Sequence, residues 1–216
     1  SYHFPPEIYL AGPVAVLRVF EILQSMSGFS VGHNLKFINF ISVRERDQII
    51  IGSGSEYLYG LIVELLGRNC VFAIESPSYK KIEQVYRATE IAYESLPLTQ
   101  SGIDSKALAE TRADVLHTTP YRSYPSGVTA TASKLHEYVD WASESGRYII
   151  EDDFESEFSV ATKPTETLFA LSENDNVIYL NTFSKTISPS LRVGYMVLPR
   201  HLVPIYQEKL GFYSCT

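Results

Sequence analysis

Lys185 is the residue of this sequence best suited to covalent chemistry. It follows the apolar run VIYLNTF at 177–183, and the hydroxyl groups of Thr182 and Ser184 flank it. A desolvated lysine near other cations loses its proton readily and attacks carbonyl carbons to form a Schiff base. Arg192 adds a fixed cation suited to a phosphate group. Taken alone, a lysine or an arginine of this kind is more often a solvated surface charge.

A second apolar run, RYIIEDD at 147–153, ends in three acidic residues, Glu151, Asp152 and Asp153. A carboxylate at the end of a strand can bind Mg²⁺, cap a helix or pair with a protonated ring nitrogen. The acidic residues alone favour metal binding or capping. A lysine and a phosphate-binding loop elsewhere in the chain shift the balance towards a pyridine cofactor, because a buried carboxylate then has a cationic partner.

A candidate phosphate loop is GSGSE at 52–56, which joins the run QIII to the amphipathic stretch EYLYGLIVELLG. A glycine-rich turn that leads into a helix offers free backbone N–H groups and the positive end of the helix dipole. Gly54, Ser55 and Glu56 are the candidate contacts. The segment lacks the lysine of GxxxxGK[ST] and the full GxGxxG spacing, so nucleotide binding is disfavoured. A tight turn with Ser55 as helix N-cap is an equally good interpretation.

Two turns could add to such a site. Tyr79, in the segment PSY at 77–79, lies at a predicted strand-to-helix junction, where its ring could stack on a planar ligand or simply pack in the core. The segment YPSG at 124–127 has the composition of a turn.

Apolar runs that alternate with amphipathic stretches predict an α/β domain with a mostly parallel sheet and helices on both of its faces. Such sheets bind ligands beyond the carboxyl ends of their strands. Strands are predicted at 48–51, 70–76, 91–98, 114–120, 147–153, 177–183 and 191–199, and helices at 55–67, 78–88, 104–110, 131–145 and 201–209. Residues 1–43 have no assignable pattern.

Composition limits the class of protein. The chain has 216 residues and a net charge of -7, which argues against a nucleic-acid-binding surface on this chain. Cys70 and Cys215 lie far apart and outside any zinc or disulfide spacing. Neither a bilayer-spanning run nor a secretion signal is recognisable, so we expect a soluble, cytoplasmic protein without membrane contact.

In order along the chain, the motifs are GSGSE, ESPSY, TTPYRSYPSG, YIIEDDFESEF and NVIYLNTFSKTISPSLRVGYMVLP. Over residues 44–216 the sequence resembles the aminotransferase-like domain of the MocR/GabR group of bacterial transcription regulators, and more distantly the fold-type I aminotransferases. The resemblance implies the large domain of an aspartate aminotransferase-like fold, with the small domain outside the chain. It also implies pyridoxal 5'-phosphate as cofactor, a homodimer, and DNA binding only through another domain.

The resemblance assigns a role to each candidate residue. It implies that Lys185 forms the Schiff base, that Asp152 pairs with the pyridine nitrogen and that Tyr79 stacks on the ring. Phe154 stands where the family usually has a tyrosine, so a hydrogen bond that tunes the cofactor is lost. The phosphate contacts that it implies are Gly54, Ser55, Glu56, Thr182, Ser184 and Arg192.

The favoured function is an effector domain that senses an amino acid or amine and performs at most a partial transamination. The alternative is a stand-alone, pyridoxal-phosphate-dependent aminotransferase. An inactive fragment is a third interpretation, and a Mg²⁺-dependent hydrolase that uses Asp152 and Asp153 is a fourth, which leaves the lysine and the glycine-rich loop without a role. Whether the protein is an enzyme stays open at this point.

Overall fold

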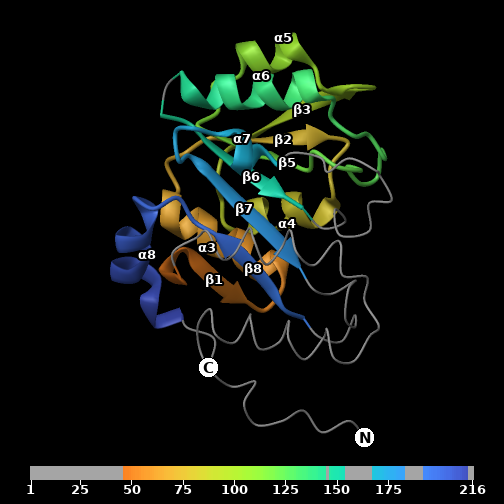
Figure 1. Cartoon of the computed structure of the whole chain (residues 1–216). Coiled ribbons are helices and arrows are strands. Elements are labelled where there is room, and N and C mark those ends of the chain that lie inside the picture. Colours follow the sequence, from red (N-terminus) through yellow and green to blue (C-terminus); the bar gives the residue numbers. More distant parts are fainter. Residues whose placement is uncertain (1–45, 145, 154–166, 183–191, 214–216) are drawn as a thin grey trace, which may run out of the picture.

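A single twisted sheet organises the protein (Figure 1). The computed structural model describes residues 46–144, 146–153, 167–182 and 192–213. Its eight strands have the order β1-β8-β7-β6-β5-β2-β3-β4. They are β1 Ile49–Gly52, β2 Phe72–Ser76, β3 Tyr93–Thr99, β4 Gly102–Ile103, β5 Val115–Thr118, β6 Tyr148–Asp152, β7 Val177–Thr182 and β8 Gly194–Val197.

Parallel pairing dominates the sheet. The pairs β3–β2, β2–β5, β5–β6 and β6–β7 are parallel, whereas β8 runs antiparallel to both β7 and β1. The carboxyl ends of β1, β2, β5, β6 and β7 therefore meet at one edge, and the start of β8 lies at that same edge. The predicted fold class, a mostly parallel sheet with helices on both faces, is confirmed.

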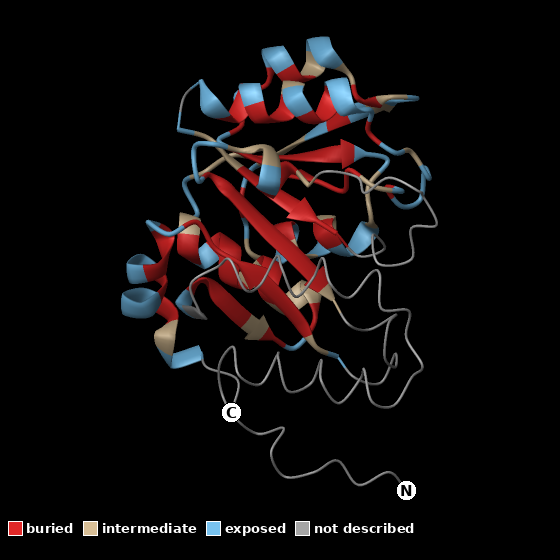
Figure 2. Cartoon of the chain, viewed as in Figure 1, coloured by how far each residue is buried: buried red, intermediate tan, exposed pale blue. Residues whose placement is uncertain are grey.

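Each face of the sheet has its own apolar core. The first core lies under α3 Ser55–Leu66, α4 Lys80–Ala88 and α8 Leu202–Leu210, and the second lies under α5 Ser105–Glu110, α6 Ala132–Ser143 and α7 Leu168–Leu171. Two 3-10 turns, η2 Arg46–Gln48 and η4 Gly211–Tyr213, complete the described elements. Alternate residues of one strand enter opposite cores, as Ile149 and Ile150 of β6 do. Figure 2 shows the central strands of the sheet buried, whereas the outer faces of the helices and many of the loops are exposed, and β3 is buried only in part.

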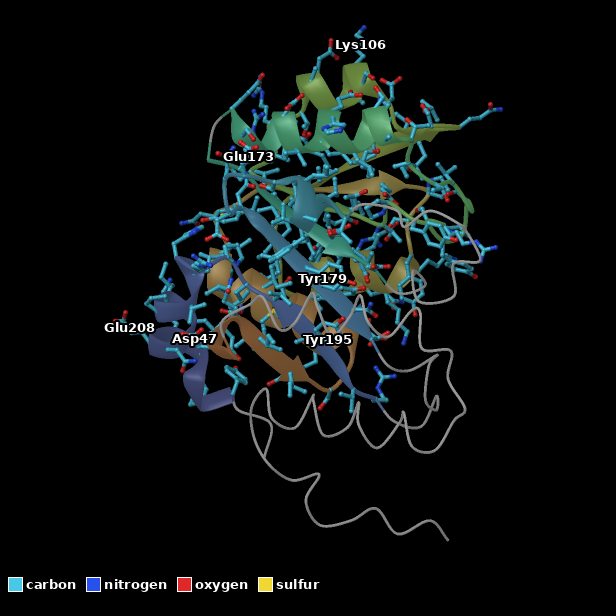
Figure 3. The ribbon with its side chains drawn as sticks, in the orientation of Figure 1. Asp47, Lys106, Glu173, Tyr179, Tyr195 and Glu208 are labelled. Carbon is cyan, nitrogen blue, oxygen red and sulfur yellow. The ribbon has the colours of Figure 1, made fainter. Side chains whose placement is uncertain are left out.

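Because of this alternation, two tyrosines lie on the face of the sheet opposite to α3. Tyr179 on β7 and Tyr195 on β8 belong to the second core, with ring centroids 6.2 Å apart, and Figure 3 shows them beside each other on the sheet, far from the charged side chains at the periphery. Neighbouring side chains on one strand therefore serve different faces. The same rule governs the acidic residues at the end of β6.

The predicted elements differ from the observed ones mainly at their ends. Every predicted strand and helix is present, most of them shorter than predicted by one to three residues at an end. Four short elements, β4, α7, η2 and η4, were not predicted. Residues 1–43 and Phe154 lie outside the described part of the chain.

Candidate cofactor site

The glycine-rich loop lies where β1 leads into α3. Gly54 has a φ of +91°, in the left-handed region that favours glycine, and α3 begins at the next residue, Ser55. The alternative with Ser55 as N-cap is wrong, since Gly54 holds that position and no side chain caps the helix. A Cβ at Gly194 would approach the carbonyl carbon of Gly54 to 3.3 Å, so the start of β8 packs directly against this loop. The first turn of α3 keeps backbone N–H groups available for an anion.

Two cations lie beside this helix N-terminus. Arg192 Nη2 lies 2.6 Å from Glu56 Oε2, and Lys81 Nζ lies 2.6 Å from Glu56 Oε1. The same Arg192 nitrogen would lie 3.3 Å from a Cβ at Gly54, so the guanidinium group covers the loop. Burial pushes the pKa of Glu56 upward, but the hydrogen bond from Lys81 and the charge of Arg192 outweigh it and leave that pKa below its ordinary value. Glu56 is therefore an ionised bridge between the two cations.

Asp152 ends β6 on the α3 side of the sheet. Its Oδ2 accepts a hydrogen bond from the hydroxyl of Tyr59, which projects from α3, and lies 3.7 Å from Nε2 of His117 on β5. Its other oxygen, Oδ1, is buried and has no hydrogen-bond partner among the described residues. A buried carboxylate requires compensation by a donor or a cation. The arrangement fits a protonated ring nitrogen at Oδ1.

Asp153 serves the opposite face. Its Oδ2 accepts a hydrogen bond of 2.8 Å from the hydroxyl of Tyr179, whose side chain belongs to the second core. Two adjacent carboxylates in one strand thus have separate environments. Only the carboxylate of Asp152 faces the helix that carries the glycine-rich loop.

Those of the other predicted residues that the structure describes lie at the same edge of the sheet. Thr182 ends β7 and pairs with Gly194, which packs on the glycine-rich loop. Tyr79 precedes α4, and its ring centroid lies 6.0 Å from that of Tyr124, in an edge-on contact. Ser184 and Lys185 lie outside the described residues. The position of the lysine therefore stays a prediction.

Four buried polar side chains near Asp152 were not predicted as site residues. Tyr59, Tyr86 and His117 have the positions of core residues, and nothing in the local sequence distinguishes them from packing side chains. The fourth, Glu75, accepts hydrogen bonds from Thr118 Oγ1 at 2.5 Å, Thr119 N at 2.9 Å and the Ser123 hydroxyl. Glu75 lies near the end of β2, two residues before PSY. Its position as an acidic residue near a strand end is the sequence signal that could have identified it.

Glu75 connects the two turns of the site. It is the penultimate residue of β2, which leads into the turn that carries Tyr79, and its three donors belong to the segment 118–123 that leads to the YPSG turn. Burial, which the hydrogen bonds oppose, raises the pKa of Glu75 to about 7. Both turns are thus fixed through one buried carboxyl group.

Within the described residues, no group of three or more His, Cys, Asp or Glu side chains could hold a metal ion. The hydrolase interpretation based on Asp152 and Asp153 also loses support because the two carboxylates face opposite cores. None of the helices in the described ranges is both long and apolar enough to cross a membrane.

Comparison with known proteins agrees with this geometry. The profile of the family described as aminotransferase class I and II matches residues 35–213. The HTH-type transcriptional regulator YdeL of Bacillus subtilis is 30% identical over 170 residues, covering 79% of this chain and 37% of that protein. The HTH-type pyridoxine biosynthesis transcriptional regulator PdxR of Corynebacterium glutamicum is 30% identical over 155 residues, covering 72% of this chain and 34% of that protein. This chain thus spans about a third of the length of these regulators.

Solved structures show the same fold. Kynurenine aminotransferase from Pyrococcus horikoshii, determined with PMP bound, has a TM-score of 0.74 and 25% identity, covering 94% of this chain and 57% of that chain. LysN, an α-aminoadipate aminotransferase of Thermus thermophilus determined with a phosphopyridoxyl-leucine adduct, has a TM-score of 0.71 and 23% identity, covering 96% of this chain and 57% of that chain. The resemblance expected from the sequence is confirmed, and pyridoxal phosphate is the cofactor that it implies.

Proposed function

The chain belongs to the aminotransferase class I and II family, and on this premise we propose that residues 44–216 form the cofactor-binding unit of an HTH-type transcription regulator. In this proposal the unit binds pyridoxal phosphate and senses an amino acid or amine. The protein is a cytoplasmic homodimer, and DNA contacts come from a segment outside this chain. The relatives that support the regulator are YdeL and PdxR.

The observation that carries the proposal is the buried Oδ1 of Asp152, which has no partner within the described residues. A neutral ligand atom would leave this carboxylate without compensation, whereas a protonated pyridine nitrogen supplies a donor and a positive charge together. Gly54, Ser55, Thr182 and Arg192 would hold the phosphate at the same sheet edge. Glu56 would contribute only its backbone N–H, because its carboxylate repels a phosphate, and in the structure that N–H donates to the Glu56 carboxylate itself.

When bound, pyridoxal phosphate supplies an electron sink for bonds at the α-carbon of an amino compound. The chain contributes Asp152, which keeps the ring nitrogen protonated, Lys185, which would attach the cofactor covalently, and Tyr79, whose ring would cover one face of the cofactor. Arg192 and Lys81 would hold the phosphate in place. Each of these side chains would either bind the cofactor or hold a proton.

An aminotransferase is the second candidate, favoured by the similarity to kynurenine aminotransferase. Turnover distinguishes the two functions. The protein is loaded with pyridoxal phosphate and mixed with a panel of amino acids and amines together with excess 2-oxo acid acceptor. A sensor shifts the cofactor absorbance and releases at most about one equivalent of oxo acid per site. Release of many equivalents would establish an enzyme, and an absorbance unchanged by every amino compound would contradict the sensing function.

A further inference from the structure

Asp152 is held by a connected set of buried side chains rather than by one contact. Tyr59 donates its hydroxyl proton to Oδ2 of Asp152, and His117 Nε2 lies 3.7 Å from the same oxygen. Ser55, one turn earlier in α3, interacts with the Tyr59 hydroxyl and partly opposes the rise of its pKa. Ser55 begins the helix at the glycine-rich loop. The phosphate loop and the carboxylate are therefore connected through a single tyrosine.

The hydrogen bond between Tyr86 and His117 determines the tautomer of the histidine. Tyr86 Oη lies 2.6 Å from His117 Nδ1, and both side chains are buried. If Nδ1 were the donor, the Tyr86 hydroxyl proton would have no acceptor among the described residues, and the lone pair of Nε2 would face a carboxylate. If Tyr86 is the donor, the proton of His117 lies on Nε2 and points towards Asp152. In the second arrangement the Tyr86 hydroxyl has an acceptor, and the Nε2 proton faces Oδ2 of Asp152 from 3.7 Å, without a hydrogen bond among the described residues.

Tyr59 stays a donor over the whole accessible pH range. Burial, together with the negative charge of Asp152, raises the pKa of Tyr59 well above its ordinary value. The hydroxyl therefore keeps its proton and cannot become a second anion beside the carboxylate. Tyr59 donates a hydrogen bond to Oδ2, and His117 Nε2 faces the same oxygen from 3.7 Å without forming one, whereas Oδ1 receives no hydrogen from the described residues.

We propose that Tyr59 and His117 are positioning residues for Asp152: Tyr59 occupies Oδ2 with its hydrogen bond, His117 Nε2 faces the same oxygen, and Oδ1 alone is offered to the ring nitrogen of the cofactor. This inference rests on the proposed function. Donors to a carboxylate stabilise its charged form. Without Tyr59, Asp152 is a stronger base and takes the proton at Oδ1, which leaves the ring nitrogen unprotonated.

The test uses pyridoxal phosphate labelled with ¹⁵N in the ring, bound to wild type, Tyr59→Phe and Tyr138→Phe. Tyr138 is a matched control, because it is equally buried and its hydroxyl accepts a hydrogen bond from Ile103 N under the opposite face of the sheet. The ¹⁵N chemical shift reports the protonation of the ring nitrogen directly. We expect a protonated nitrogen in wild type and Tyr138→Phe. In Tyr59→Phe the ratio of protonated to unprotonated nitrogen should fall about tenfold, the usual effect of one hydrogen bond to a charged group.

Different outcomes would overturn the positioning role and the proposed function. A bound cofactor whose ¹⁵N signal is the same in Tyr59→Phe and wild type overturns the positioning role and leaves the proposed function intact. A wild-type protein that binds no cofactor overturns both. Imidazole ¹⁵N signals of the cofactor-free protein should also show His117 in the Nε2–H tautomer. The Nδ1–H tautomer there would overturn the arrangement independently of any cofactor.

Discussion

At the scale of single residues, Glu56 competes with a phosphate for Lys81 and Arg192. Both cations lie 2.6 Å from its carboxylate. We expect Glu56→Gln to strengthen the binding of pyridoxal phosphate by roughly three- to tenfold, because the phosphate no longer competes with a carboxylate for the two cations and charge pairs at an exposed site are individually weak. Isothermal titration measures this. Glu64→Gln, near the other end of α3, removes an ion pair with Arg68, which lies just past the end of the helix; it is the control and should leave the affinity unchanged. Weaker binding in Glu56→Gln would show that the Glu56 carboxylate contributes to cofactor binding instead of competing with the phosphate.

The two acids at the end of β6 give a second residue-scale prediction. Asp152 faces Tyr59 and His117, whereas Asp153 accepts a hydrogen bond from Tyr179 in the other core. Asp152→Asn should weaken cofactor binding at least about tenfold, because a neutral amide cannot balance a protonated ring nitrogen. Asp153→Asn should be much milder in the same absorbance titration. Equal effects would contradict the assignment of Asp152.

At the scale of elements, the turn between β1 and α3 depends on a left-handed glycine. Gly54 has a φ of +91°, and Gly67, at the other end of α3, has a φ of +98°. Both residues combine this positive φ with an extended ψ, of 175° at Gly54 and 147° at Gly67, so alanine at either position costs about 1–3 kcal/mol of unfolding free energy, measurable by urea denaturation. A Cβ at Gly54 would lie 3.3 Å from Arg192 Nη2, whereas a Cβ at Gly67 would meet nothing within 4 Å. Only Gly54→Ala should therefore also weaken pyridoxal phosphate binding. Equal loss of affinity in both variants would exclude a specific role for the loop.

The buried carboxyl of Glu75, which connects two turns of the site, should make the free energy of unfolding depend on pH. Its pKa is raised by burial to about 7, from about 4.5 in the unfolded chain. The folded state then binds the proton more tightly, so this carboxyl contributes stability at low pH that is lost as the pH rises from about 4.5 to about 7. Glu75→Gln keeps an acceptor for Thr118 and Thr119, so it should flatten the decline over that window. Urea denaturation across the window measures the slope, and an unchanged slope would mean that Glu75 is ionised in the folded protein.

Sequence patterns predicted the elements better than the site. The long runs alternate clearly, whereas β4 has two residues and α7 has four, too few for a periodic signal. Glu151 accepts hydrogen bonds from Leu168 N and Phe169 N, a tertiary contact that holds the start of α7 and that local sequence does not encode. His117 approaches Asp152 only because β5 pairs with β6. Strand order decides which buried polar side chains meet, and composition does not reveal it.

At the scale of the whole molecule, the net negative charge disfavours DNA binding by this chain. Its net charge of -7 opposes binding to a polyanion. We therefore expect the 216-residue chain to leave duplex DNA unretarded in gel-shift assays at physiological salt, even when it is loaded with cofactor. Binding that weakens steeply with added salt would contradict this and would place a DNA-contacting surface on this chain.

If the proposed function holds, the sheet edge formed by Gly54, Asp152 and Arg192 binds pyridoxal phosphate, and Lys185 attaches it covalently. We would test this by borohydride reduction of the protein with pyridoxal phosphate, followed by peptide mapping by mass spectrometry. We expect a visible absorption band that reduction abolishes, with the pyridoxyl group on the peptide that contains Lys185, and neither effect in Lys185→Ala. Labelling at other lysines, or equal labelling of Lys185→Ala, would show that Lys185 is not the attachment residue.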